Sequence, residues 1–168
     1  MPKGDSNYYI MDIELRKTLT DLNNVIKNFL AQFDLDCKLG ADFGYYWESE
    51  VVEYAIIVTE RFDKLFTEYL NAHYSDVTAP LFIWSLLHEV GHSETDDYFN
   101  DEAHCIFDEY KQSLDPNKDS DVMEYYNCPD EVLATKWAYL YIRDNAPKVE
   151  ALWNEIYPLL KKISLYVD

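Results

Sequence analysis

Two histidines spaced four residues apart, with a glutamate beside the first, are the residues of this sequence best suited to chemistry. They are His88, Glu89 and His92, in the stretch "WSLLHEVGHSET" of residues 84–95. Positions four apart on a helix lie on the same face, so both imidazoles can converge on one point. Glu89 lies about 100° further round the axis, near enough to reach a water held at that point. The spacing predicts a metal site with a carboxylate base beside it.

The alternative is a core helix that happens to carry these three polar side chains. The segment around them is apolar almost all round, which predicts a helix buried on most sides. A buried unpaired polar group costs about 1–3 kcal/mol, and a divalent cation removes that cost. Gly91 is a second indication, because glycine inside a helix costs about 1 kcal/mol relative to alanine and is usually kept where another backbone comes close. We therefore favour the metal site.

A third protein ligand is expected elsewhere in the chain. Catalytic zinc typically has three protein ligands and an open fourth position for water. The continuation HExxHxxGxxH is absent, since Thr95 and Tyr98 stand where it needs glycine and histidine. His104 is a weak candidate and is better explained as a helix-face residue beside Glu102 and Asp108.

Glu131 is a better candidate for the third ligand. It starts a predicted helix on which Ala134 and Ala138 follow on the same side, and these small residues allow close packing against the region of Gly91. However, the helix dipole also favours Asp130 and Glu131 in a first turn without any metal. The spacing alone leaves both interpretations open.

The two segments together resemble the gluzincin peptidases, most closely the ImmA/IrrE-type metallopeptidases. That family usually has an HExGH helix followed by a later helix that reads ExxANxFA. Glu131, Ala134, Trp137 and Ala138 match the later pattern, with Thr135 in place of the asparagine. The insert between the two motifs is longer and more acidic than is typical of the family, and no helix-turn-helix domain accompanies it.

The resemblance implies a zinc-dependent metallopeptidase (HExxH type) that hydrolyses a peptide bond in a protein or peptide substrate. His88, His92 and Glu131 would hold Zn²⁺, and Glu89 would accept a proton from water and pass it to the leaving amine. Carboxylates that hydrogen-bond to the histidines without touching the metal would orient them, and the candidates are Asp130, Asp96 and Asp97. With fifteen tyrosines, the sequence does not identify the group that stabilises the oxyanion.

Two alternatives to a peptidase stay open. The first is a catalytically inactive zincin-like interaction module, for instance from a phage or mobile element. In such a protein, a residue such as His104 or Glu102 would close the metal's fourth position. The second is a helical binding domain without any metal.

The elements that must position these residues follow from the apolar periodicity. We expect one domain over residues 1–168, of class α+β and mainly α, with a zincin-like helical core and a small antiparallel sheet of two or three strands within residues 35–58. Helices are expected over 15–33, from Glu60 to an end near Asn71 to Asp76, after a cap at Thr78, over 99–113, from Pro129 to Asp144 and from Ala146 with a break or bend at Pro158. A loop is expected around Pro116. The first of these helices carries an apolar stripe that suits the domain's own core better than a dimer seam.

Composition limits the partners. The formal net charge is −18, so the surface repels nucleic acid and anionic lipid over about 8–10 Å in physiological salt. We expect no nucleic-acid partner and no membrane segment, and the N-terminal residues 1–17 show no apolar leader. Three cysteines without ligand spacing predict free thiols and a cytoplasmic location. The sequence does not indicate the oligomeric state.

Overall fold

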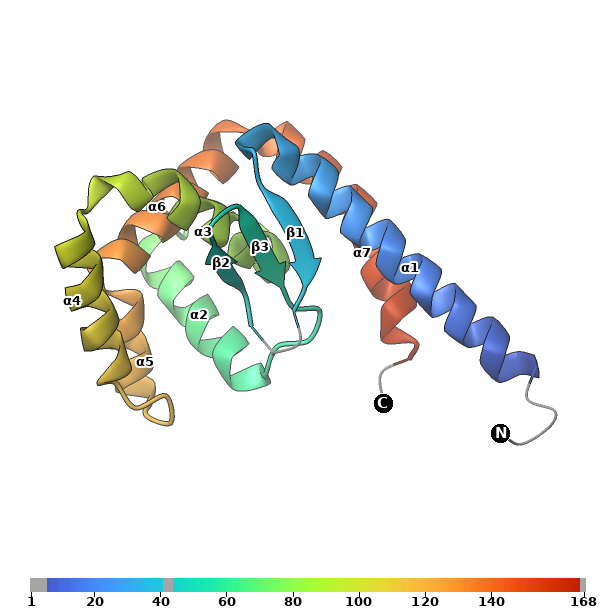
Figure 1. The fold of residues 1–168 in the computed structure, drawn as a ribbon, viewed down its shortest axis with the longest axis horizontal. Helices are drawn as coiled ribbons and strands as arrows, with labels where there is room; N and C mark the ends of the chain where they lie inside the picture. The colour runs from blue at the N-terminus through green and yellow to red at the C-terminus, as the bar shows by residue number, and fades with distance from the viewer. Residues whose placement is uncertain (1–5, 41–43, 167–168) are drawn as a thin grey trace.

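Helices surround a small sheet in this protein, whose computed structural model describes residues 6–40 and 44–166 (Figure 1). The helices are α1 (Ser6–Leu30), α2 (Glu60–His73), α3 (Leu81–Thr95), α4 (Asp101–Gln112), α5 (Asp119–Tyr126), α6 (Pro129–Asp144) and α7 (Ala146–Ser164). The strands are β1 (Asp36–Leu39), β2 (Tyr46–Glu48) and β3 (Val51–Tyr54), and two short 3-10 helices are η1 (Ala31–Phe33) and η2 (Asp96–Tyr98). The expected α+β class, mainly α, is confirmed. Residues 1–5, part of the segment inspected for a leader, and residues 41–43, within the expected strand region, lie outside the described residues.

The sheet is mixed, which corrects the expectation of an antiparallel one. Its order is β1-β3-β2, and the central strand β3 pairs antiparallel with β2 but parallel with β1. Cys37 of β1 and Trp47 of β2 both face Val52 of β3 in the register. The number of strands was predicted correctly. The pairing was not, because period-two alternation tells which side chains share a face and says nothing about which strands are neighbours.

Helix α3 forms the centre of the core. It packs against α6 along its length and also contacts β2 and β3. Ten of its residues are buried, and Ile83, Leu86, Leu87 and Val90 have no exposed surface. The predicted burial of this segment on most sides is therefore confirmed, and its polar residues His88, Glu89 and Thr95 are buried as well.

Helices α1 and α7 pack side by side, with the two described ends of the chain at the same end of the molecule (Figure 1). Two residues of the predicted apolar stripe of α1, Leu22 and Ile26, are fully buried in the core, as is Leu30, which was not part of that stripe. The other members of the stripe, Leu15, Leu19, Phe29 and Phe33, are partly buried against the core. Burial in the chain's own core agrees with the interpretation favoured from the sequence.

Three helices differ from prediction. Helix α1 begins at Ser6, before the expected residue 15, and ends at Leu30. Helix α3 begins at Leu81 after an extended Pro80, with no side-chain cap, so Thr78 does not cap it. Helix α7 continues to Ser164 through Pro158, so it does not break where a break or bend was expected. Proline removes only one helical hydrogen bond, and the buried residues Ile156 and Ile163 on either side hold the helix to the core.

The segment between α3 and α6 contains one helix that the sequence analysis missed. Helix α4 agrees with the expected 99–113, but α5 follows the loop expected around Pro116 in a segment for which no helix was predicted. Val122 is the only buried residue of α5, so this helix has almost no apolar periodicity to detect.

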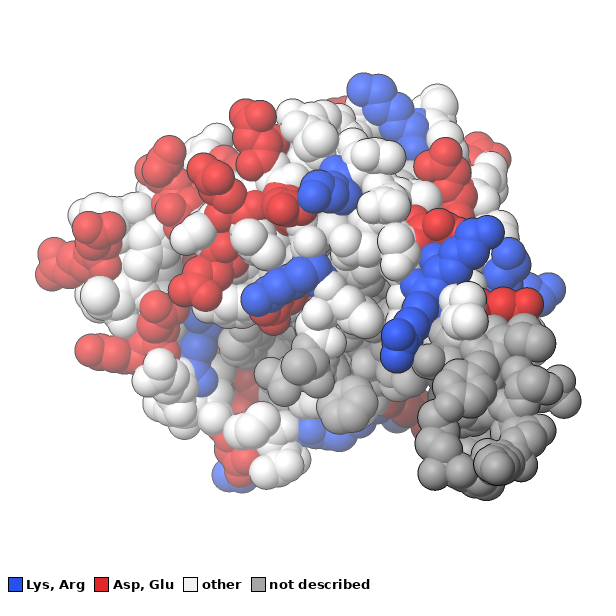
Figure 2. Space-filling view, turned by 45° about the vertical axis from the view of Figure 1, so that its right-hand side comes forward, with Lys and Arg blue, Asp and Glu red and all other residues white. Residues whose placement is uncertain are grey.

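The surface carries the large acidic excess of the composition. Figure 2 shows aspartate and glutamate spread over one face, with lysine and arginine standing singly or in small groups between them. None of the helices in the described part of the chain combines the length and apolar character needed to cross a membrane.

Candidate metal centre

Helices α3 and α6 bring the candidate ligands together where they cross. His88 and His92 lie one turn apart on α3, and Glu131 lies in the first turn of α6. The crossing is close at Gly91, where a Cβ atom would lie only 2.3 Å from the backbone oxygen of Ala134. Glycine is therefore required at this position for the approach of the two backbones, as the sequence analysis expected.

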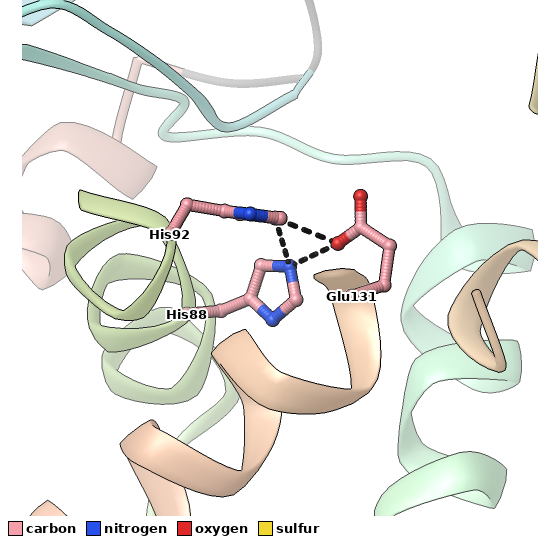
Figure 3. Close-up of side chains that lie close together, drawn as sticks. All are labelled: His88, His92 and Glu131. Carbon is pink, nitrogen blue, oxygen red and sulfur yellow. Dashed lines mark hydrogen bonds and ion pairs between the residues drawn. The ribbon is translucent and has the colours of Figure 1, made fainter. Parts of the chain in front are cut away.

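One nitrogen from each histidine and one oxygen from the glutamate meet at a single point (Figure 3). The Nε2 atoms of His88 and His92 each lie 2.7 Å from Oε2 of Glu131 and 3.1 Å from each other. Ligand atoms bonded at 2.0–2.1 Å in a tetrahedral zinc site are about 3.3 Å apart. The two 2.7 Å separations would have to widen by about 0.6 Å and the 3.1 Å separation by about 0.2 Å to fit such an ion, which small side-chain rotations supply, so these three residues could hold a metal.

A threonine fixes the ring nitrogen that His88 turns toward this point. The hydroxyl of Thr135 donates to the backbone oxygen of Glu131 at 2.9 Å, so it accepts a hydrogen bond from Nδ1 of His88, also at 2.9 Å. Nε2 of His88 then carries a lone pair and faces Oε2 of Glu131, a second electron-pair donor. Two such atoms at 2.7 Å require a proton or a metal ion between them.

Thr135 takes the orienting role that the sequence analysis gave to carboxylates. Among the described residues, neither Asp96 nor Asp97 nor Asp130 hydrogen-bonds to the two histidines. Thr135 is fully buried, and its position was noted in the sequence only as a departure from the usual asparagine. Like the amide oxygen of an asparagine, a threonine hydroxyl can accept a hydrogen bond from a histidine ring nitrogen. A threonine at the position where asparagine is usual was therefore the signal that could have identified this role.

The candidate fourth ligands do not join the group. Nε2 of His104 donates to the backbone oxygen of Asp96 at 2.9 Å and lies 3.4 Å from its side chain. Glu102 is exposed on α4. Within the described part of the chain, the group that could hold a metal has three members, His88, His92 and Glu131.

The protonation of the site follows from burial and close charges. Burial raises the pKa of Glu131, but its contacts with His88 and His92 outweigh burial and hold that pKa well below its usual value. Burial lowers the pKa of His92, but the hydrogen bond to Glu131 and the nearby carboxylates raise it to about 9. Glu131 is thus an anion, and in the absence of a metal its partner His92 carries a proton.

Glu89 is the buried carboxylate beside the group. It is 8% exposed, and burial raises its pKa, while the charges of His88 and His92 act in the opposite direction. A carboxylate with a raised pKa is a stronger base than an ordinary glutamate, which suits a general base. The structure therefore leaves Glu89 suited to the role expected of it from the sequence.

A cleft of about 380 Å³ opens onto the group, and a more apolar pocket of about 250 Å³ adjoins it. Glu89, Tyr45 and Tyr125 line both. The ring centroid of Tyr125 lies 5.4 Å from Nζ of Lys111, and burial and then the charge of Glu131 raise the pKa of Tyr125. The sequence could not distinguish Tyr125 from the other tyrosines, since it lies on α5, the helix that went unpredicted.

Lys111 is a further residue of the site that the sequence analysis did not single out. Its Nζ lies 2.7 Å from Oδ2 of Asp130 and 3.3 Å from Oε1 of Glu131. Burial lowers the pKa of Lys111, but the two carboxylates raise it above its usual value, so the ammonium is charged. The site is a network of opposite charges around the convergent histidines.

Comparison of the chain with known protein families, with curated proteins and with solved structures finds no match. The geometry of the site must therefore carry any functional conclusion.

Proposed function

We propose that the protein is a zinc-dependent metallopeptidase. One observation carries the proposal: Nε2 of His88, Nε2 of His92 and Oε2 of Glu131 converge within 3.1 Å in a buried site that opens into a cleft beside Glu89. Two histidines and a glutamate are a common ligand set of catalytic zinc. An inward-facing carboxylate that is not a ligand is the additional group that peptide hydrolysis needs.

In this proposal each residue has a separate task. His88, His92 and Glu131 would hold the zinc ion, which would supply polarisation of the peptide carbonyl and a lowered pKa of water. Glu89 takes a proton from the attacking water and delivers it to the leaving amine nitrogen. Tyr125, on the wall of the cleft, donates a hydrogen bond to the carbonyl oxygen as negative charge develops there.

The open fourth position supports a catalytic site over a purely structural one. Structural zinc sites are closed by four protein ligands, whereas catalytic sites keep one position for water or substrate. The group has three members within the described residues, and His104 is bound to Asp96. This arrangement favours the peptidase over the inactive interaction module.

The test combines metal analysis with a cleavage assay. The chain is purified without chelators, its zinc is counted by elemental analysis, and a proteome-derived peptide library is digested and read by mass spectrometry. We expect one zinc per chain and cleavage at defined sites. Glu131→Ala should lose both zinc and cleavage, whereas Glu89→Gln should keep zinc and lose cleavage by at least about 100-fold.

The Glu89→Gln variant separates the peptidase from its alternatives. If the wild-type chain binds zinc but cleaves no more than Glu89→Gln does, the inactive module is the correct account. Absence of any transition metal from the wild-type chain would instead support a metal-free helical binding domain.

A further inference from the structure

The second oxygen of Glu131 has its own partner, which comes from a different helix. Oε2 points to the two histidines, and Oε1 lies 3.3 Å from Nζ of Lys111 on α4. The same Nζ is bound to Asp130 at 2.7 Å. The three side chains are only 14%, 12% and 3% exposed for Lys111, Asp130 and Glu131. The two oxygens of Glu131 are thus divided between the histidines and the lysine.

Helix α4 turns the face that carries Lys111 toward the rest of the molecule. No residue of α4, Asp101–Gln112, is fully buried, but on that face Phe107 packs edge-on against Phe99 and His104 bonds to Asp96. Burying an ammonium is costly unless it is paired and hydrogen-bonded, and here two carboxylates meet that condition. The inward position of Lys111 is explained by its contacts with the two acidic residues that begin α6.

We infer that Lys111 is a positioning residue that makes Glu131 a one-oxygen metal ligand. By occupying Oε1, it leaves Oε2 alone to face the ion, and it fixes the carboxylate plane against rotation. Asp130 balances the charge of Lys111, so the ammonium can lie close to a cation site without adding net positive charge. The inference rests on the metal centre proposed above.

This role explains why the acidic residue before Glu131 is buried. Asp130 is 9% exposed and was expected to orient a histidine, but its Oδ2 binds Lys111 instead. The lysine and the aspartate together act on the third ligand, whereas Thr135 acts on the first. Partners that orient metal ligands are typically worth about 10- to 100-fold in metal affinity.

The test removes the pair without changing net charge. The double variant Lys111→Met/Asp130→Asn loses one positive and one negative charge. A change in zinc affinity therefore reports on the orientation of Glu131 and not on a change in net charge near the metal site. Lys38→Met/Glu53→Gln is the matched control, because that pair has the same 2.7 Å separation on the exposed sheet. Zinc affinity is measured by competition with a chromophoric chelator, and the cobalt(II)-loaded proteins are compared by visible absorption.

We expect the double variant to bind zinc about 10- to 100-fold more weakly than the control. Its cobalt spectrum should weaken, because a Glu131 free to bind through both oxygens raises the coordination number of the ion. Lys111→Arg, which keeps charge and donors, should retain the wild-type spectrum, and circular dichroism verifies the fold of each variant.

Zinc affinity and cobalt spectrum equal to the control would overturn the positioning role while leaving the metal centre intact. A wild-type chain that binds neither ion would overturn the proposed function, and the inference with it.

Discussion

Thr135 decides which nitrogen of His88 faces Glu131. Its hydroxyl is committed as a donor to the backbone of its own helix, so it can only accept from Nδ1 of His88. Helix periodicity and a short motif were sufficient to select His88 and His92, because they identify residues that share a face. Spacing left Glu131 open, and only the family resemblance implied it as the third ligand. The sequence was not sufficient to find Thr135, which acts across two helices and whose role depends on where its hydroxyl hydrogen points.

Replacing Thr135 with valine tests this orienting role at the scale of one side chain. Thr135→Val keeps the shape but leaves Nδ1–H of His88 without an acceptor in a fully buried position. We expect zinc affinity to fall about 10- to 100-fold in a chelator competition titration. The unfolding free energy should fall by about 1–3 kcal/mol.

Thr18→Val is the control for this substitution. Thr18 is also buried, but its hydroxyl bonds only to the backbone of its own helix, at Glu14. Its zinc affinity should match that of the wild type. Equal losses in the two variants would show that Thr135 contributes to folding alone.

At the scale of secondary structure, the site depends on one helix crossing. Gly91 lets α3 and α6 approach until the ligands on both helices meet. The helices α3 and α6 were predictable, since each carries an apolar or helix-start pattern within its own sequence. The sheet pairing and α5 were not, because strand neighbours are chosen by tertiary contacts and α5 buries only Val122.

A methyl group at Gly91 should disturb both the fold and the metal site. The added Cβ would lie 2.3 Å from the Ala134 oxygen, so α3 and α6 must move apart. We expect Gly91→Ala to lower the free energy of unfolding by about 1–3 kcal/mol in a denaturant titration, although alanine favours the helix intrinsically. Zinc binding should weaken as the ligands separate.

Gly44→Ala provides the comparison, because a Cβ at Gly44 meets no atom within 4 Å. Its stability and zinc affinity should remain near those of the wild type. A Gly91→Ala protein as stable as Gly44→Ala would show that the crossing of α3 and α6 accommodates an added methyl group, contrary to the expectation from its geometry.

For the molecule as a whole, the proposed metal centre links the stability of the fold to pH. The ligands belong to α3 and α6, which form the middle of the core, so an ion that binds them stabilises the entire fold. The acidic surface, with 32 Asp and Glu against 14 Lys and Arg, was evident from composition and is distributed around this core. What composition could not reveal is a histidine whose pKa is raised to about 9 by a buried carboxylate.

The metal-free protein should lose stability as the pH rises. The pKa of His92 is about 9 in the fold against 6.5 ordinarily, so its contribution is fully present below pH 6.5 and is lost as the pH rises through about 9. With zinc in excess, the trend should reverse, because protons compete less for His92 at higher pH. Thermal unfolding followed by circular dichroism from pH 6.5 to 9, with chelator or with zinc, measures both trends.

Substitution of His92 should abolish both trends, whereas substitution of His104, which lies outside the group, should preserve them. His92→Asn and His104→Asn are the matched variants. If His92→Asn still lost stability with rising pH in the presence of chelator, another residue would be responsible for that pH dependence.

The most direct test of the metal centre is the anomalous scattering of a crystal of the protein measured on both sides of the zinc absorption edge. The account predicts one peak per chain that appears only above the edge, bonded to Nε2 of His88, Nε2 of His92 and one oxygen of Glu131. A peak at another site, or a peak held by the two histidines without Glu131, would contradict it.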